Sequence, residues 1–202
     1  MPSTNNQVVE DLFYQALETE IGGEAVYETA LECVKNADLK KEWKKYLAET
    51  RTHQKILTGV LQAAGLDPEL RTPGREVVKT IGDALVAAMK KAQVAGDPAA
   101  AEIVAGECVV LAETKDHMNW DLLKQLSETN KKYEKLLAEA VEEVHSQEAH
   151  HLFHSKGWTR ELWIQALGLP AVLPPPEEVK QVETAIGASR AEQAREQMLS
   201  SS

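Results

Sequence analysis

The fold is decided by a stretch near the end of the chain, VHSQEAHHL at residues 144–152. On an α-helix, residues three or four positions apart share one face, so Val144, Glu148 and His151 lie along a single line. The apolar face that Val141 and Val144 define therefore continues into a carboxylate and an imidazole. Isolated charges in an apolar interior are costly, and a cation shared among several such groups removes that cost. We therefore expect this helix to direct a polar site into the interior of a helical protein.

Glutamate and histidine recur at helical spacing elsewhere in the chain. Three further pairs are three or four residues apart: Glu49 with His53, Glu113 with His117, and Glu142 with His145. Both members of such a pair can reach one spot beside their helix. When four helices of a bundle direct such pairs toward its interior, the side chains can form a dinuclear carboxylate metal site.

The apolar faces indicate which of these side chains point inward, at about 100° of rotation per residue. Glu20 lies near the middle of the apolar stripe of the first expected helix, and His53 lies inside the stripe of the second. Glu113 lies on one of two apolar faces of the fourth. Some of these expected ligands could be replaced by other side chains. The alternatives are Glu24, Glu107, and the pair Glu142 and His145.

The depth of each group along its helix gives a second criterion. Glu20 lies about 17 residues before the first expected turn and His53 about 16 residues after it. Glu113 lies about 17 residues before the second expected turn and Glu148 about 18 residues after it. Because the rise per residue of a helix is constant, the two halves place their polar groups at matching depths.

Periodicity, capping residues and helix breakers predict six helices, over residues 6–36, 38–65, 75–95, 98–128, 131–155 and 158–167. Asp38 is the expected cap of the second helix, residues 66–74 are an expected loop, and Gly157 is expected to end the fifth helix. Gly22-Gly23 either admits a close backbone, keeps space near the site, or marks a kink. Two helix pairs with short turns, joined by a long connection with its own helix, give a bundle with one crossover.

Composition excludes several classes of protein. The 202 residues are 43% hydrophobic and 5% aromatic, and 22 basic against 32 acidic residues give a net charge of -10. Such a chain lacks the basic stripe of a nucleic-acid surface and attracts cations. No stretch approaches the ~20 apolar residues of a membrane span, and the start MPSTNNQVVEDLF has no signal-peptide pattern. We expect a cytoplasmic protein with Cys33 and Cys108 as free thiols.

The chain is expected to divide near its end. Residues 1–170 form one helical domain, and residues 171–202 form a Pro-rich linker and a polar tail with few large apolar side chains. Such a tail cannot bury much surface, so we expect it to be disordered or docked on a partner.

These features resemble the ferritin-like superfamily, in particular its rubrerythrin and bacterioferritin type of di-iron carboxylate protein. The resemblance covers residues 6–155 and rests on Glu20, ETRTH at 49–53, ETKDH at 113–117 and EAHH at 148–151. That family has one Glu on each of the first and third core helices and a Glu-x-x-His on each of the second and fourth. EAHH fits this spacing, ETRTH is one residue longer, and His117 is additional to the minimal pattern. The Cys-x-x-Cys pairs of a rubredoxin-like iron domain are absent from the sequence.

The resemblance implies an all-α, ferritin-like four-helix bundle with one long crossover containing an extra helix, plus a short C-terminal helix and an extended tail. It implies two metal ions, iron first, with manganese or zinc as alternatives. The implied ligands are Glu20, Glu49, His53, Glu113, His117, Glu148 and His151, with Glu49 and Glu148 as bridges. The implied activity is that of an oxidoreductase acting on ferrous iron, peroxide or oxygen, in a homo-oligomer of two or more chains. Tyr27 is then either a redox-active or hydrogen-bonding neighbour of the site, or a core tyrosine.

Two other functions compete with this interpretation. A metal-free helical bundle could work through partners, using Trp158 and Trp163, which we expect to be exposed, and the polar tail. An oxygen-carrying or oxygen-sensing bundle of hemerythrin type would need histidines on all four helices, and the first helix has none. The histidines at 150, 151 and 154 form either a surface metal patch or the ordinary cationic end of a helix.

Overall fold

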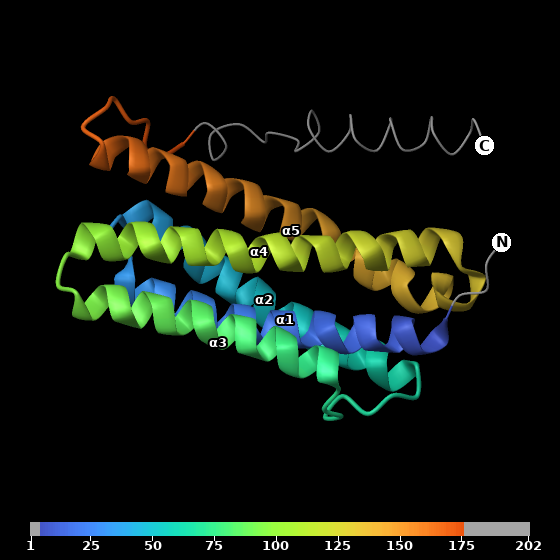
Figure 1. Cartoon of the computed structure of the whole chain (residues 1–202). Coiled ribbons are helices and arrows are strands. Elements are labelled where there is room, and N and C mark those ends of the chain that lie inside the picture. The colour runs from blue at the N-terminus through green and yellow to red at the C-terminus, as the bar shows by residue number, and fades with distance from the viewer. Residues whose placement is uncertain (1–4, 176–202) are drawn as a thin grey trace, which may run out of the picture.

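The computed structural model describes residues 5–175, which contain five α-helices and no strand (Figure 1). The helices are α1 (Asn6–Cys33), α2 (Ala37–Ala63), α3 (Pro73–Val94), α4 (Pro98–Thr129) and α5 (Lys131–Ala166). The expected all-α class is therefore confirmed. None of these five helices has the length and hydropathy needed to cross a bilayer.

Each helix begins where a polar side chain can bind its free backbone N–H groups. Asp97 caps α4 and Pro98 occupies its first turn, as expected. The cap of α2 is Asn36 and not Asp38, because the Asn36 side chain accepts from the backbone N–H of both Asp38 and Leu39. A single residue, Asn130, separates α4 from α5 and caps the latter.

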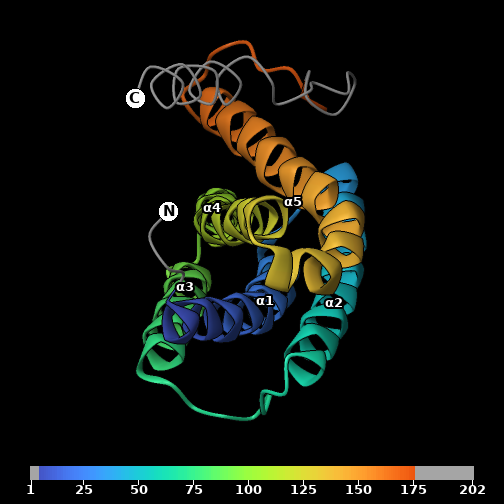
Figure 2. The ribbon, with the colours of Figure 1, turned by 90° about the vertical axis from the view of Figure 1, so that its right-hand side faces the viewer.

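Four of the helices form a bundle around one axis (Figure 2). α1 packs against α2 and α4, and α5 packs against the same two helices, so α1 and α5 lie diagonally opposite. Short turns join α1 to α2 and α4 to α5. The long connection between these pairs carries α3, which lies outside the bundle against α1 and α4.

Specific contacts hold the connection and the turns in place. The buried Arg75 of α3 donates from Nε to Glu18 of α1 at 2.6 Å, which fixes the start of α3. Gly22 of α1 faces Gly82 of α3, where a Cβ on Gly82 would lie 3.4 Å from the Gly22 Cα. The paired glycines thus allow a close approach of two backbones, which was one of the alternatives left open by the sequence.

The apolar core is divided into two clusters by a polar layer. One cluster contains Tyr27, Trp43 and Tyr46, and the other contains Phe13 and Leu57. On each bundle helix, buried ionisable residues near the middle lie between the stretches that contribute to these two clusters: Glu20, His53, Glu113, Asp116, Glu148 and His151. Glu102 and Glu161, also buried, lie outside this layer. The polar layer therefore crosses the middle of the bundle, as the matching depths predicted.

α5 does not end at Gly157. It continues to Ala166, so the expected break and the separate short C-terminal helix are both wrong. A glycine within a helix costs about 1 kcal/mol relative to alanine. Burial of Trp158 and Leu162 in the core offsets that cost. The expected linker lies only partly within the described residues, and the tail from 176 to 202 lies outside them.

Candidate metal centre

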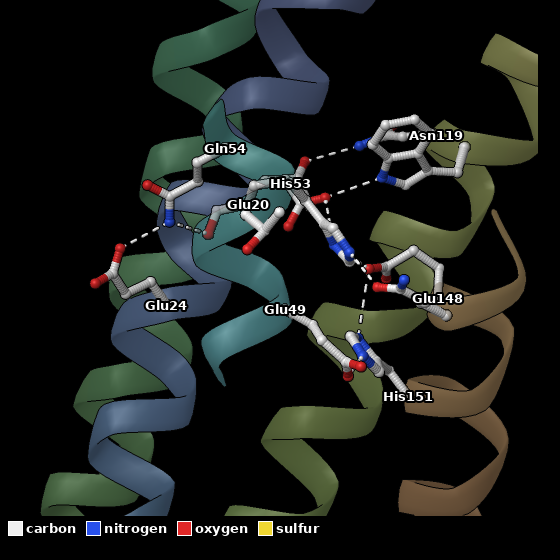
Figure 3. A network of polar contacts seen from close by, with 12 residues as sticks. Glu20, Glu24, Glu49, His53, Gln54, Asn119, Glu148 and His151 are labelled. Carbon is white, nitrogen blue, oxygen red and sulfur yellow. Dashed lines mark hydrogen bonds and ion pairs between the residues drawn. The ribbon is translucent and has the colours of Figure 1, made fainter. Parts of the chain in front are cut away.

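Five side chains from four helices meet in the middle of the bundle. Glu20 comes from α1, His53 from α2, Glu113 from α4, and Glu148 and His151 from α5, and all are at most 3% exposed. Figure 3 shows Glu20, His53, Glu148 and His151 directed toward one another. These are five of the seven ligands that the sequence analysis named.

The five side chains form two groups of three that share one member. Ligand atoms of Glu20, His53 and Glu148 lie within 4.8 Å of one another, and so do those of Glu113, Glu148 and His151. Both groups can hold a metal ion. Because Glu148 belongs to both, its carboxylate lies where it can bridge two ions.

The imidazole Nδ1 atoms point into the centre. His53 Nδ1 lies 2.7 Å from Glu148 Oε1 and 3.4 Å from Glu20 Oε1. His151 Nδ1 lies 3.4 Å from the same Glu148 oxygen and 3.7 Å from Glu113 Oε2. The two rings are stacked with centroids 5.8 Å apart. One carboxylate oxygen thus lies between two imidazole nitrogens.

The opposite ring nitrogens are occupied by acceptors. His53 Nε2 donates to Gln147 Oε1 at 2.9 Å, and His151 Nε2 donates to Glu49 Oε2 at 2.9 Å. An acceptor at Nε2 favours the tautomer that leaves the Nδ1 lone pair available to a metal. The surrounding side chains therefore orient both rings as ligands.

Unpartnered polar atoms are concentrated at this centre. Among residues 5–175, eight buried side-chain atoms make no assigned hydrogen bond, although some of them, such as His53 Nδ1 and Glu148 Oε1, lie within ion-pair distance of one another. The eight atoms are Glu20 Oε2, Tyr27 Oη, His53 Nδ1, Glu113 Oε2, Asp116 Oδ1, both Glu148 oxygens and His151 Nδ1. Buried polar atoms are ordinarily satisfied, so a group of such atoms in one place is what a site that could hold a metal ion would show.

Charge supports the same conclusion. Burial, together with the Glu148 charge, raises the pKa of Glu20 and raises the pKa of Glu113 further. Burial by itself lowers the pKa of both histidines, but the adjacent carboxylates outweigh it and raise the pKa of His53 to about 11 and that of His151 to about 10. Burial by itself would raise the pKa of Glu148, but the two histidines lower it. The centre without metal thus requires protons to offset its negative charge.

Asp116 is a buried acid that the sequence analysis did not select. It is 4% exposed, and its pKa is raised far above the ordinary value by burial and by the nearby Glu20 and Glu148 carboxylates. Asp116 lies three residues after Glu113, so the i,i+3 spacing could have identified it. Asp116 has no histidine three or four residues away, and the spacing in ETKDH favours His117 instead.

His117 does not lie in the centre. Its Nδ1 is 3.2 Å from Asp121 Oδ2, and His145 Nε2 contacts the other Asp121 oxygen at 2.8 Å. Four residues after Glu113 the helix has turned toward its solvent-facing side, where Asp121 is half exposed. His117 and the alternative His145 therefore form a separate polar contact between α4 and α5.

Glu49 and the other alternative carboxylates also have partners outside the centre. One Glu49 oxygen contacts the outer nitrogen of His151 and the other lies 3.7 Å from Lys45 Nζ, so Glu49 is not placed as a bridge. Glu24 binds Arg51 and Gln54, and Glu107 accepts from Trp163. The exposed Glu142 carboxylate does not contribute to either group of ligands.

Comparisons of the chain with protein-family models, with curated proteins and with solved structures found no match. The residues of the centre themselves therefore indicate what it could bind.

Proposed function

We propose that the protein binds two divalent metal ions at this centre. One ion would take Glu20, His53 and Glu148, and the other would take Glu113, His151 and Glu148. The concentration of orphaned buried atoms carries this proposal. Charge supports it, because four buried carboxylates, including Asp116, would balance two divalent cations if both histidines are neutral.

Iron is the metal we favour, with manganese and zinc as alternatives. Carboxylate oxygens with two imidazole nitrogens form a ligand set of mixed hardness, which suits all three metals. In the ferritin-like proteins that the chain resembles, bound iron exchanges electrons with oxygen or peroxide. We propose the same broad class for this protein, an oxidoreductase acting on ferrous iron, peroxide or oxygen.

The residues around the centre would support such chemistry in three ways. Gln147 and Glu49 hold the imidazoles in the tautomer that binds metal. Trp120 donates from Nε1 to Glu20 Oε1 at 2.9 Å, which orients that carboxylate. The two apolar clusters on either side exclude water, which strengthens the electrostatic interactions inside.

Metal analysis of purified protein tests this proposal. After expression with added iron and removal of loosely bound ions, we expect about two metal ions per chain. Glu148→Gln should lower the content strongly because Glu148 belongs to both groups of ligands. Glu142→Gln is the matched control on the same helix and should retain full occupancy. A wild-type protein without metal, or equal loss in both variants, would refute the proposal.

The alternative function depended on two exposed tryptophans. Trp158 is only 1% exposed and belongs to the core, so that expectation is wrong. Trp163 is 44% exposed, but its indole donates to Glu107 at 3.0 Å. The described residues therefore do not present the paired aromatic surface on which that function rested.

A further inference from the structure

Tyr46 lies between the centre and a partly exposed histidine, His154. The Tyr46 ring lies 4.4 Å from the His151 ring and 6.3 Å from the Tyr27 ring, measured between centroids. Tyr46 is 1% exposed, yet its hydroxyl reaches His154 Nδ1 at 2.9 Å. His154 is partly exposed and lies one helical turn after His151. Tyr46 thus contacts a ligand of the centre with its ring and a partly exposed imidazole with its hydroxyl.

We propose that Tyr46 relays single electrons between the metal centre and the surface, with His154 accepting the phenolic proton. This inference rests on the proposed function, because the centre must hold a redox-active metal. It goes beyond that function by naming the residue through which an external one-electron donor reaches the buried site.

The relay step conserves atoms and charge. Two ferrous ions would supply both electrons that a first hydrogen peroxide requires, so Tyr46 would give one electron to a further peroxide bound at the same centre. The Tyr46 O–H bond breaks as an N–H bond forms at His154 Nδ1, which leaves a neutral tyrosyl radical and an imidazolium. An external one-electron reductant then reduces the tyrosyl radical, and the proton returns from His154 to the Tyr46 oxygen. Two such cycles supply the two electrons that convert one peroxide, with two protons, into two molecules of water.

Local charge makes the proton acceptor necessary. Lys45 Nζ lies 5.5 Å from the Tyr46 ring centroid. A positive charge near the ring opposes formation of a radical cation, so the electron can leave readily only if the proton leaves as well. His154 accepts that proton at hydrogen-bond distance.

Tyr27 is less suited to this role although it is closer to the carboxylates. Its buried hydroxyl makes no close hydrogen bond and has the Glu113 carboxyl as its neighbour, a proposed metal ligand that would be engaged by the ion. Substitution of Tyr27 therefore tests whether the relay is specific to Tyr46, because Tyr27 has no counterpart of His154 beside its hydroxyl.

Rapid freeze-quench electron paramagnetic resonance tests the relay. Protein loaded with ferrous iron is mixed with an excess of hydrogen peroxide over iron, so that oxidant remains after the iron has been oxidised. The tyrosyl radical signal is followed in time, and the iron content is measured for every variant. We expect a radical in the wild type and none in Tyr46→Phe, which keeps the ring and loses the hydroxyl. His154→Gln, which retains polar groups but lacks a comparable base, should slow radical formation about 100-fold. Tyr133→Phe is the matched control, since Tyr133 lies in the other core cluster.

The outcomes separate the two proposals. If the wild type binds iron but forms no tyrosyl radical, or if Tyr46→Phe retains it, the relay is refuted and the metal centre stands. Loss of the radical in Tyr27→Phe with retention in Tyr46→Phe would transfer the role to Tyr27 and refute our assignment. Absence of metal from the wild type would overturn both proposals.

Discussion

Glu148 is the residue on which the two halves of the centre depend. Its carboxylate lies beside both imidazole Nδ1 atoms, and its two oxygens have no hydrogen-bond partner. It also raises the pKa of Glu20 and Glu113 across the bundle. Glu148 is thus attracted to the two histidines and repelled by the other buried carboxylates. Two bound cations would remove that repulsion.

Glu49 provides a test of the outer contacts at the residue scale. Glu49→Ala removes the acceptor for His151 Nε2, so the ring loses its fixed orientation and part of its basicity. We expect metal affinity to fall about 10- to 100-fold while the stoichiometry at saturating metal is unchanged. Glu42→Ala, with the same change of charge on the same helix, is the control for titrations with ferrous iron or zinc. Equal affinities in the two variants would show that the Glu49 contact has no role in binding.

At the scale of elements, the close approach of α4 and α5 sets the position of α5. A Cβ added at Gly106 of α4 would lie 2.5 Å from the Thr159 hydroxyl oxygen of α5. The two helices can therefore approach this closely only with glycine at that position. The same packing accompanies α5 as it continues past Gly157, where its sequence suggests an end.

Gly106→Ala should consequently destabilise the fold. The added methyl group must displace Thr159, so we expect a loss of about 1–3 kcal/mol in the free energy of unfolding. Gly59→Ala is the matched control, because no atom lies within 4 Å of a Cβ there. Alanine at this helical position should stabilise by about 0.5–1 kcal/mol. Chemical denaturation of both variants measures the difference, and a neutral or stabilising effect of Gly106→Ala would contradict the packing described for α4 and α5.

At the scale of the whole molecule, the proposed metal centre draws on all four bundle helices. Its proposed ligands come from α1, α2, α4 and α5 and lie between the two apolar clusters. Occupied sites would therefore stabilise the assembled bundle, because the unfolded chain does not bring these ligands together.

Removal of metal should lower the thermal stability. At free metal about 100 times the Kd, each site adds about 2.7 kcal/mol to the free energy of unfolding. We expect a chelator to lower the Tm of the wild type and to leave the Tm of Glu148→Gln almost unchanged. Differential scanning calorimetry with and without chelator gives both values. A wild-type Tm insensitive to chelator, with metal removal verified, would exclude the metal as a structural element.

The stability of the metal-free protein should fall as pH rises. The pKa values of His53, His151 and Glu113 are higher in the folded protein than in the unfolded chain, so folding takes up protons. Their contribution is complete below the unfolded pKa and is lost as pH rises toward the folded pKa, about 11 for His53 and about 10 for His151. Urea unfolding at about pH 6 and about pH 9 should show lower stability at the higher pH. An increase over this interval would contradict the assigned shifts.

The sequence by itself determined the first four helices and the inward direction of Glu20, His53, Glu148 and His151, and it left Glu107 open beside Glu113. Helical periodicity is a local property, so the spacing of apolar residues is sufficient to identify a buried face. The same spacing, with the short turns, set the depth at which these groups meet.

Only the tertiary structure decided the rest. It placed Asp116 beside Glu20, turned Glu49 to the outer nitrogen of His151, and carried α5 past Gly157. Each of these outcomes depends on side chains from other helices, and a single helix contains no information about its neighbours. The physical reason is that packing and shared charge act between segments, whereas periodicity acts within one.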